Sequence, residues 1–177
     1  MSAQEVFDVI ERVPAIRTPD TGVVNVLSLK EGIKFENVRF RYPTQPEKTR
    51  DIFSGINFTI KSGTSTAIVG PSGSGKSTIV QLCNRMYDTL NGDISYDGVN
   101  LRNFNLKSLR ESVGYVSQEP VLIYGSIKEN LLYGNSDATE KDIEEALSLA
   151  NAQFVHTLDL GLDTFVGVGS MLNLSGG

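Results

Sequence analysis

The stretch "TAIVGPSGSGKST", residues 66–78, places a glycine-rich loop between a short apolar run and a helical segment. Gly70, Gly75, Lys76 and Ser77 satisfy the pattern G-x-x-x-x-G-K-[ST]. Glycines allow successive backbone N–H groups to approach phosphate oxygens because no Cβ stands in the way. The helix that follows adds unpaired amides and the positive end of its dipole. We expect the Lys76 ammonium to reach the β- and γ-phosphates and the Ser77 hydroxyl to ligate Mg²⁺.

A chance glycine turn before a helix is the alternative to a phosphate site, and the context argues against it. A random match in a chain of this size should occur on the order of one time in a hundred, and this one has an apolar run before it and a helix after it. The pattern therefore predicts a nucleoside phosphate site, although kinases, GTPases, helicases and motor ATPases share the loop. The residues expected to contact the nucleotide are Gly70, Pro71, Ser72, Gly73, Ser74, Gly75, Lys76, Ser77 and Thr78.

Composition sets limits on the other classes of function. The 177 residues suffice for one domain with a real core, and 40% hydrophobic with 21% charged residues is typical of a soluble globular protein. A formal net charge of −5 argues against a nucleic-acid partner, because no excess of Lys and Arg is available to meet a phosphate backbone. The single cysteine, Cys83, excludes an internal disulfide, and we interpret it as a small buried apolar residue.

Hydrophobic periodicity predicts an α/β core with an antiparallel lobe ahead of it. The alternation in "IKFENVRF" is typical of a half-buried strand, and Asp97-Gly98 can supply the positive φ angles of a tight hairpin turn. Thr139 with Asp142 predicts a helix N-cap. The elements expected are strands at 33–40, 56–60, 65–70 and 113–117, a hairpin at 94–101, and helices at 3–12, 76–86 and after residue 139.

Several phrases, in one order, resemble the nucleotide-binding domain of an ABC transporter, most closely the multidrug-resistance exporters of the P-glycoprotein type. They are "FENVRFRYP", "GINFTIKSGTSTAIVGPSGSGKST", "NGDISYDGVNLRNFNLKSLRESVGYVSQEPVL", "SIKENLLYGN" and "LSGG". The resemblance implies a P-loop NTPase (RecA-like) core with an antiparallel β lobe and part of an α-helical subdomain, C-terminally incomplete. It also implies that residues 1–31 form a linker from an upstream membrane domain and residues 32–177 the front part of the nucleotide-binding domain.

The resemblance assigns roles outside the phosphate loop. Tyr42 matches the aromatic residue that stacks on adenine; without the resemblance, a tyrosine packed at a strand end is the simpler interpretation. Gln118 matches the family's glutamine, whose amide helps ligate Mg²⁺ and the attacking water while its loop senses the membrane domain. We therefore expect Lys76 and Gln118 to be catalytic, and Ser77 and Gln118 to bind Mg²⁺.

The last residues resemble the beginning of the family signature, although a Gly-Gly turn is the simpler alternative. The resemblance implies that Ser175, Gly176 and Gly177 face the γ-phosphate held by a second nucleotide-binding domain in a head-to-tail dimer. The preceding "VGVGSMLNLSGG" departs from the family pattern, which usually has a glutamate and one fewer residue there. A role of that stretch in coupling is therefore in doubt.

The function implied is Mg·ATP binding by an exporter domain at the cytosolic face of a membrane, with ATP hydrolysis driving transport. The aspartate, glutamate and histidine that the family places after the signature do not occur in these 177 residues, so we expect the fragment to bind ATP without turning it over. Two alternatives stay open: a non-hydrolytic regulatory or dimerisation module, and a soluble ABC ATPase that does not transport. The expected partners are a second nucleotide-binding domain and the parent's membrane domain.

Overall fold

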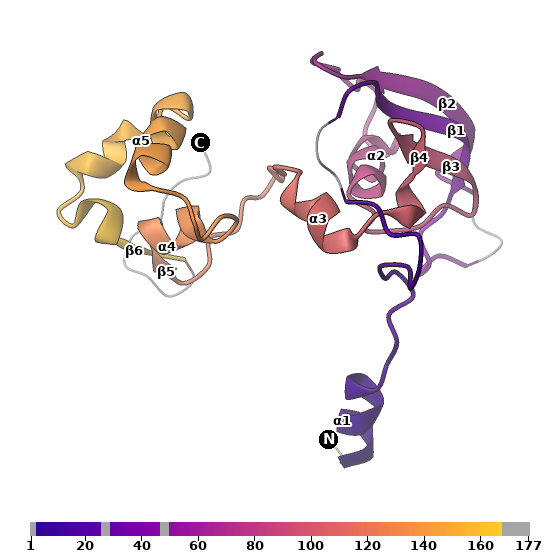
Figure 1. Cartoon of the computed structure of the whole chain (residues 1–177), viewed down its shortest axis with the longest axis horizontal. Coiled ribbons are helices and arrows are strands. Elements are labelled where there is room, and N and C mark those ends of the chain that lie inside the picture. The colour runs from indigo at the N-terminus through magenta and orange to yellow at the C-terminus, as the bar shows by residue number, and fades with distance from the viewer. Residues whose placement is uncertain (1–2, 26–28, 47–49, 168–177) are drawn as a thin grey trace. The chain divides into compact units, whose positions relative to one another are not determined.

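The structure, a computed structural model, describes residues 3–25, 29–46 and 50–167 (Figure 1). These residues fall into two compact units, Met1–Gly114 and Tyr115–Gly177. Each unit has its own cluster of buried apolar side chains. The units are therefore described one at a time.

An antiparallel sheet with the order β2-β1-β3-β4 is the framework of the first unit (Figure 1). Strand β1 buries Phe35, Val38 and Phe40, and Phe35 lies opposite both Phe58 and Ile94; a register shift between Phe35 and Val38 interrupts the alternation that the sequence predicts. Asp97 and Gly98 take positive φ angles of 50° and 77° between β3 and β4, which confirms the expected hairpin turn. The strands are β1 (Gly32–Phe40), β2 (Phe53–Lys61), β3 (Asn91–Tyr96) and β4 (Val99–Asn100).

Two helices contribute to the core of this unit. Helix α2 (Lys76–Cys83) provides Ile79 and Leu82, and helix α3 (Leu106–Glu111) provides Leu109; these side chains join the sheet's buried phenylalanines in one cluster. The Tyr96 hydroxyl donates to the Cys83 carbonyl at 2.8 Å. Burial raises the pKa of the Cys83 thiol to about 11, so this thiol stays protonated at neutral pH, in agreement with a structural role.

The strands predicted at 65–70 and 113–117 do not form in the described chain, and this part of the prediction is wrong. Val69 and Val116 are each 88% exposed. An apolar run becomes a strand only when another strand pairs with it, and among the described residues neither run is part of a ladder. Instead, Ile68 and Val113 line an apolar groove of about 450 Å³ beside α2.

The segment after helix α1 (Ala3–Ile10) is attached to the rest of the first unit by hydrogen bonds. Val24 N–H donates to the Asn103 carbonyl, and the Val24 carbonyl accepts from Asn105 N–H at 2.9 Å. The buried Arg85 side chain donates to the Arg17 carbonyl at 3.3 Å. The turn that follows α2 is therefore connected to the N-terminal segment.

Asp97 fixes the start of β1, and this contact predicts a pH dependence of stability. Its carboxylate accepts N–H bonds from Gly32, Lys30 and Glu31 at 2.9, 2.8 and 2.7 Å, which hold its pKa below the ordinary value. A depressed carboxyl pKa contributes stability above the ordinary pKa that is lost as the pH falls through the folded-state pKa.

Between about pH 5 and about pH 3, the wild type should therefore lose more free energy of unfolding than Asp97→Asn does. Asparagine tolerates the positive φ of 50° at this position. Urea unfolding at each pH measures the difference. Parallel pH profiles of the two proteins would contradict the assignment.

The second unit packs short elements around a small core of buried apolar side chains. Ser126 with Glu129 and Thr139 with Asp142 form capping boxes at the starts of α4 and α5, and the second pair confirms the predicted N-cap. No helix in the described residues combines the length and apolar character needed to cross a membrane. The elements are β5 (Gly125–Ser126), α4 (Ile127–Leu132), α5 (Glu140–Leu149), the 3₁₀ helices Gln153–Thr157 and Gly161–Asp163, and β6 (Phe165–Val166).

Candidate functional site

The glycine-rich loop makes a tight turn directly before α2. Ser74 N–H donates to the Pro71 carbonyl at 3.3 Å across the turn. Gly73 and Gly75 take φ angles of 78° and 92°, a left-handed backbone that side chains with a Cβ rarely adopt. Ser74 Oγ also lies 2.8 Å from where a Cβ on Gly70 would be. The loop geometry therefore depends on these glycines, as the sequence predicts.

Gly75 additionally brings the loop close to the sheet. A Cβ built on it would lie 2.6 Å from Cε1 of the Phe53 ring and 2.9 Å from Cγ2 of Ile52. Phe53 is buried at the start of β2. The loop is thus packed directly against the core, which fixes where α2 begins.

The start of α2 carries backbone N–H groups without a side-chain cap. Gly75 occupies the N-cap position, and the first helical bond is from Ile79 N–H to the Gly75 carbonyl at 3.1 Å. The N–H groups of the first turn, at residues 76–78, have no helical acceptor because the residues four positions before them lie outside the helix. Such amides, together with the helix dipole, favour an anion at this end.

Lys76 brings a positive charge to the same place. Its Nζ donates to the carbonyls of Gly70 and Pro71, both at 2.9 Å, so the side chain folds back over the loop. An ammonium has three donors and binds charged oxygens more strongly than neutral carbonyls. Phosphate oxygens can therefore replace the carbonyls as its partners.

The two hydroxyl residues after Lys76 differ in their surroundings. Ser77 is exposed at the first turn of α2, where its hydroxyl is accessible to a metal ion or a phosphate. Thr78 is only 4% exposed, and its Oγ1 lies 2.8 Å from the hydroxyl oxygen of Tyr42. Of these two residues, Ser77 therefore has the exposed side chain that the predicted metal ligand requires.

Tyr42 lies against the phosphate-loop helix. Its hydroxyl donates a hydrogen bond to Gln81 Oε1 at 2.8 Å and forms a second hydrogen bond with Thr78 Oγ1. Its ring packs edge-on against those of Phe40 and Tyr87, each with a centroid distance of 5.1 Å. The structure therefore brings Tyr42 and the loop together. The sequence analysis missed Gln81, which stands 39 positions away from Tyr42 and has no motif of its own.

The remaining predicted site residues are not part of this cluster as described. Gln118 lies in the second unit, at an exposed bend. Ser175, Gly176 and Gly177 lie outside the described residues. The roles assigned to these four residues stay predictions.

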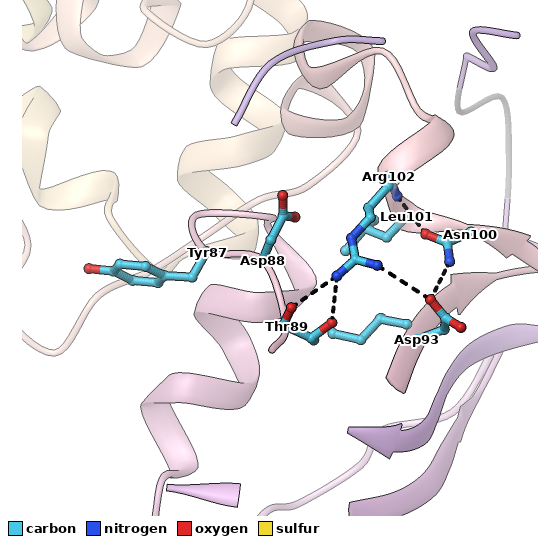
Figure 2. Close-up of a pocket in the computed structure, with 8 residues that line it drawn as sticks. Tyr87, Asp88, Thr89, Asp93, Asn100, Leu101 and Arg102 are labelled. Carbon is cyan, nitrogen blue, oxygen red and sulfur yellow. Dashed lines mark hydrogen bonds and ion pairs between the residues drawn. The ribbon is translucent and has the colours of Figure 1, made fainter. Parts of the chain in front are cut away.

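A small hollow lined by residues between α2 and α3 holds a polar network (Figure 2). Arg102 donates to the carbonyl and hydroxyl of Thr89, at 3.0 and 2.9 Å, and pairs with Asp93 at 3.6 Å. Asn100 donates to the same Asp93 oxygen at 2.6 Å. The space left is about 10 Å³, room for about one water molecule. We interpret this network as a support for the turn between α2 and β3.

Comparison with known proteins gives one consistent result. The family model described as "ABC transporter" matches residues 53–177. The chain is 46% identical over 167 residues to ABC transporter B family member 21 of Arabidopsis thaliana, covering 94% of this chain and 13% of that protein. It is 46% identical over 175 residues to ABC transporter B family member 4 of Dictyostelium discoideum, covering 98% of this chain and 22% of the relative. The chain thus spans less than a quarter of the length of either relative.

A solved structure of a bacterial Atm1-family ABC exporter with ATP bound superimposes with a TM-score of 0.83 at 34% identity. The match covers 93% of this chain and 28% of the exporter chain. The expected P-loop fold with an antiparallel lobe, and the resemblance on which that expectation depends, are therefore confirmed.

Proposed function

Because the chain belongs to the ABC transporter family, we propose that it binds Mg·ATP in the loop of residues 70–78. We further propose that, in its parent protein, ATP hydrolysis drives export of a substrate across a membrane. The observation that carries the binding proposal is the uncapped start of α2 beside the Lys76 ammonium. Gly73 and Gly75 support this proposal, because their positive φ angles give the loop a left-handed backbone that residues with a Cβ rarely adopt.

Each part of the site has a physical role in this proposal. The amides at residues 76–78 would donate to phosphate oxygens, and Lys76 would contact the β- and γ-phosphates. Mg²⁺, when bound, neutralises phosphate charge, and Ser77 would hold it, with Gln118 as a second ligand. Tyr42 would stack on the adenine. Gln118 would also orient the attacking water.

The partners follow from the same proposal. A second nucleotide-binding domain would meet this one head to tail, with Ser175, Gly176 and Gly177 contributing to the partner's ATP site. Residues 1–31 would link an upstream membrane domain to the nucleotide-binding domain at 32–177, at the cytosolic face of the membrane. The contacts of Arg17 with Arg85 and of Val24 with Asn103 and Asn105 support such a linker, because they fix this segment on residues of the proposed domain.

A titration with a fluorescent ATP analogue in Mg²⁺ tests the binding proposal, and a Tyr42→Ala variant tests the stacking. The wild type should show saturable binding that unlabelled ATP displaces. Tyr42→Ala should weaken ATP about tenfold, because base–aromatic stacking contributes about 1–3 kcal/mol, and should weaken pyrophosphate far less.

Tyr133→Ala, which removes an exposed tyrosine of the second unit, is the matched control and should change neither affinity. Equal losses of ATP and pyrophosphate affinity in Tyr42→Ala would remove the stacking role. Absence of displaceable binding by the wild type would contradict the proposed function itself.

A further inference from the structure

The hydroxyl of Tyr42 is the middle of a chain of hydrogen bonds that ends on α2. Gln81 Oε1 can only accept a hydrogen bond, so the Tyr42 hydroxyl donates its single proton to this oxygen, at 2.8 Å. The Tyr42 oxygen must then accept from the Thr78 hydroxyl, also at 2.8 Å. Two successive bonds of this kind polarise and strengthen one another.

Thr78 and Gln81, the two hydrogen-bond partners of Tyr42, both belong to the helix that begins at Lys76. Thr78 lies in its first turn and Gln81 lies three residues later, so the two side chains share one face of α2. Thr78 is buried, which keeps its hydroxyl in one place. With Phe40 and Tyr87 against the ring, the orientation of Tyr42 is set by the same helix that presents its first amides to a phosphate.

We propose that Thr78 and Gln81 are positioning residues for base recognition: they hold the Tyr42 ring at a fixed place relative to the phosphate loop. This inference rests on the proposed function, because it assigns these residues to the adenine end of the same site. A ring that is already fixed loses little conformational freedom when a base stacks on it, and this preorganisation appears as affinity. The part of ATP affinity that depends on the base should therefore depend on Gln81, which would act through the Tyr42 ring.

The experiment compares Mg·ATP with Mg·tripolyphosphate, which lacks the base, on the full 177-residue chain. Gln81→Met keeps the length of the side chain and removes the acceptor. Tyr42→Phe keeps the ring and removes both hydrogen bonds. Affinities are measured by displacement of a fluorescent ATP analogue, and the unfolding temperature of each variant is recorded alongside.

Gln81→Met should weaken ATP about fivefold, because the released ring must then be ordered when the base binds, and should leave tripolyphosphate affinity within about twofold of the wild type. Tyr42→Phe should weaken ATP by at least as much. The double variant should be no weaker than Tyr42→Phe alone, because the hydrogen bond to Gln81 is already absent in it. A purely structural role would lower the unfolding temperature without changing the ratio of the two affinities.

Wild-type ATP affinity in both single variants, with tripolyphosphate still bound, would overturn the positioning role and leave the proposed function standing. Losses that add in the double variant would also overturn it, because the two residues would then act independently. A wild-type chain that binds neither ligand would overturn the proposed function, and this inference with it.

Discussion

The Lys76→Ala chain is expected to bind Mg·ATP about 100-fold more weakly than the wild type, with little change in its free energy of unfolding. Hydrogen bonds to a charged partner contribute about 1.5–3 kcal/mol each, and an ammonium that contacts two phosphates makes at least two of them. In the structure its partners are the carbonyls of Gly70 and Pro71 at an exposed loop. Those carbonyls can accept hydrogen bonds from water when the lysine is removed, so the free energy of unfolding should change little.

Displacement of a fluorescent ATP analogue measures the affinity, and urea unfolding measures the stability. Lys107→Ala is the matched control: it removes the same charge from the same unit, but its side chain is 84% exposed on α3, where it pairs with Glu111 at 3.8 Å. A surface pair of this kind contributes little, so ATP affinity should not change. Unchanged affinity in Lys76→Ala, or an equal loss in Lys107→Ala, would contradict the phosphate-loop assignment.

The parts of the fold that the sequence predicts are those with local signals. The strand at β1, the Asp97-Gly98 turn and the Thr139–Asp142 cap each depend on residues a few positions apart, and each is present in the structure. The loop of residues 70–78 belongs to the same class, because its glycines and Lys76 are consecutive or nearly so. Hydrogen-bond geometry within such short segments is set mainly by their own residue types.

The parts that the sequence did not predict depend on distant partners. The apolar run at 65–70 has strand composition, but a strand also needs a neighbour to pair with, and composition does not reveal whether one is present. The contact of Tyr42 with Gln81 spans 39 positions and follows no pattern. The second reason for a glycine at position 75, the Phe53 ring beside it, could not be seen either, because the loop motif explains that glycine already.

Gly75→Ala is expected to destabilise the chain by about 3 kcal/mol, whereas Gly73→Ala should cost about 1 kcal/mol. Both glycines have a left-handed backbone, for which a Cβ costs about 1–2 kcal/mol. Only at Gly75 would the new Cβ also collide with Phe53, at 2.6 Å; nothing lies within 4 Å of a Cβ on Gly73. Forcing an extra carbon into a packed core adds about 1–3 kcal/mol.

The pair of variants separates backbone strain from the collision, because the backbone term is common to both. Urea unfolding gives each free energy, and the difference between the two variants measures the cost of the contact with Phe53. If ATP affinity is measured on the same proteins, Gly75→Ala should lose it more strongly, because relief of the collision moves the start of α2 and its amides. Equal destabilisation by the two substitutions would show that the close packing of Gly75 against β2 does not determine where this helix begins.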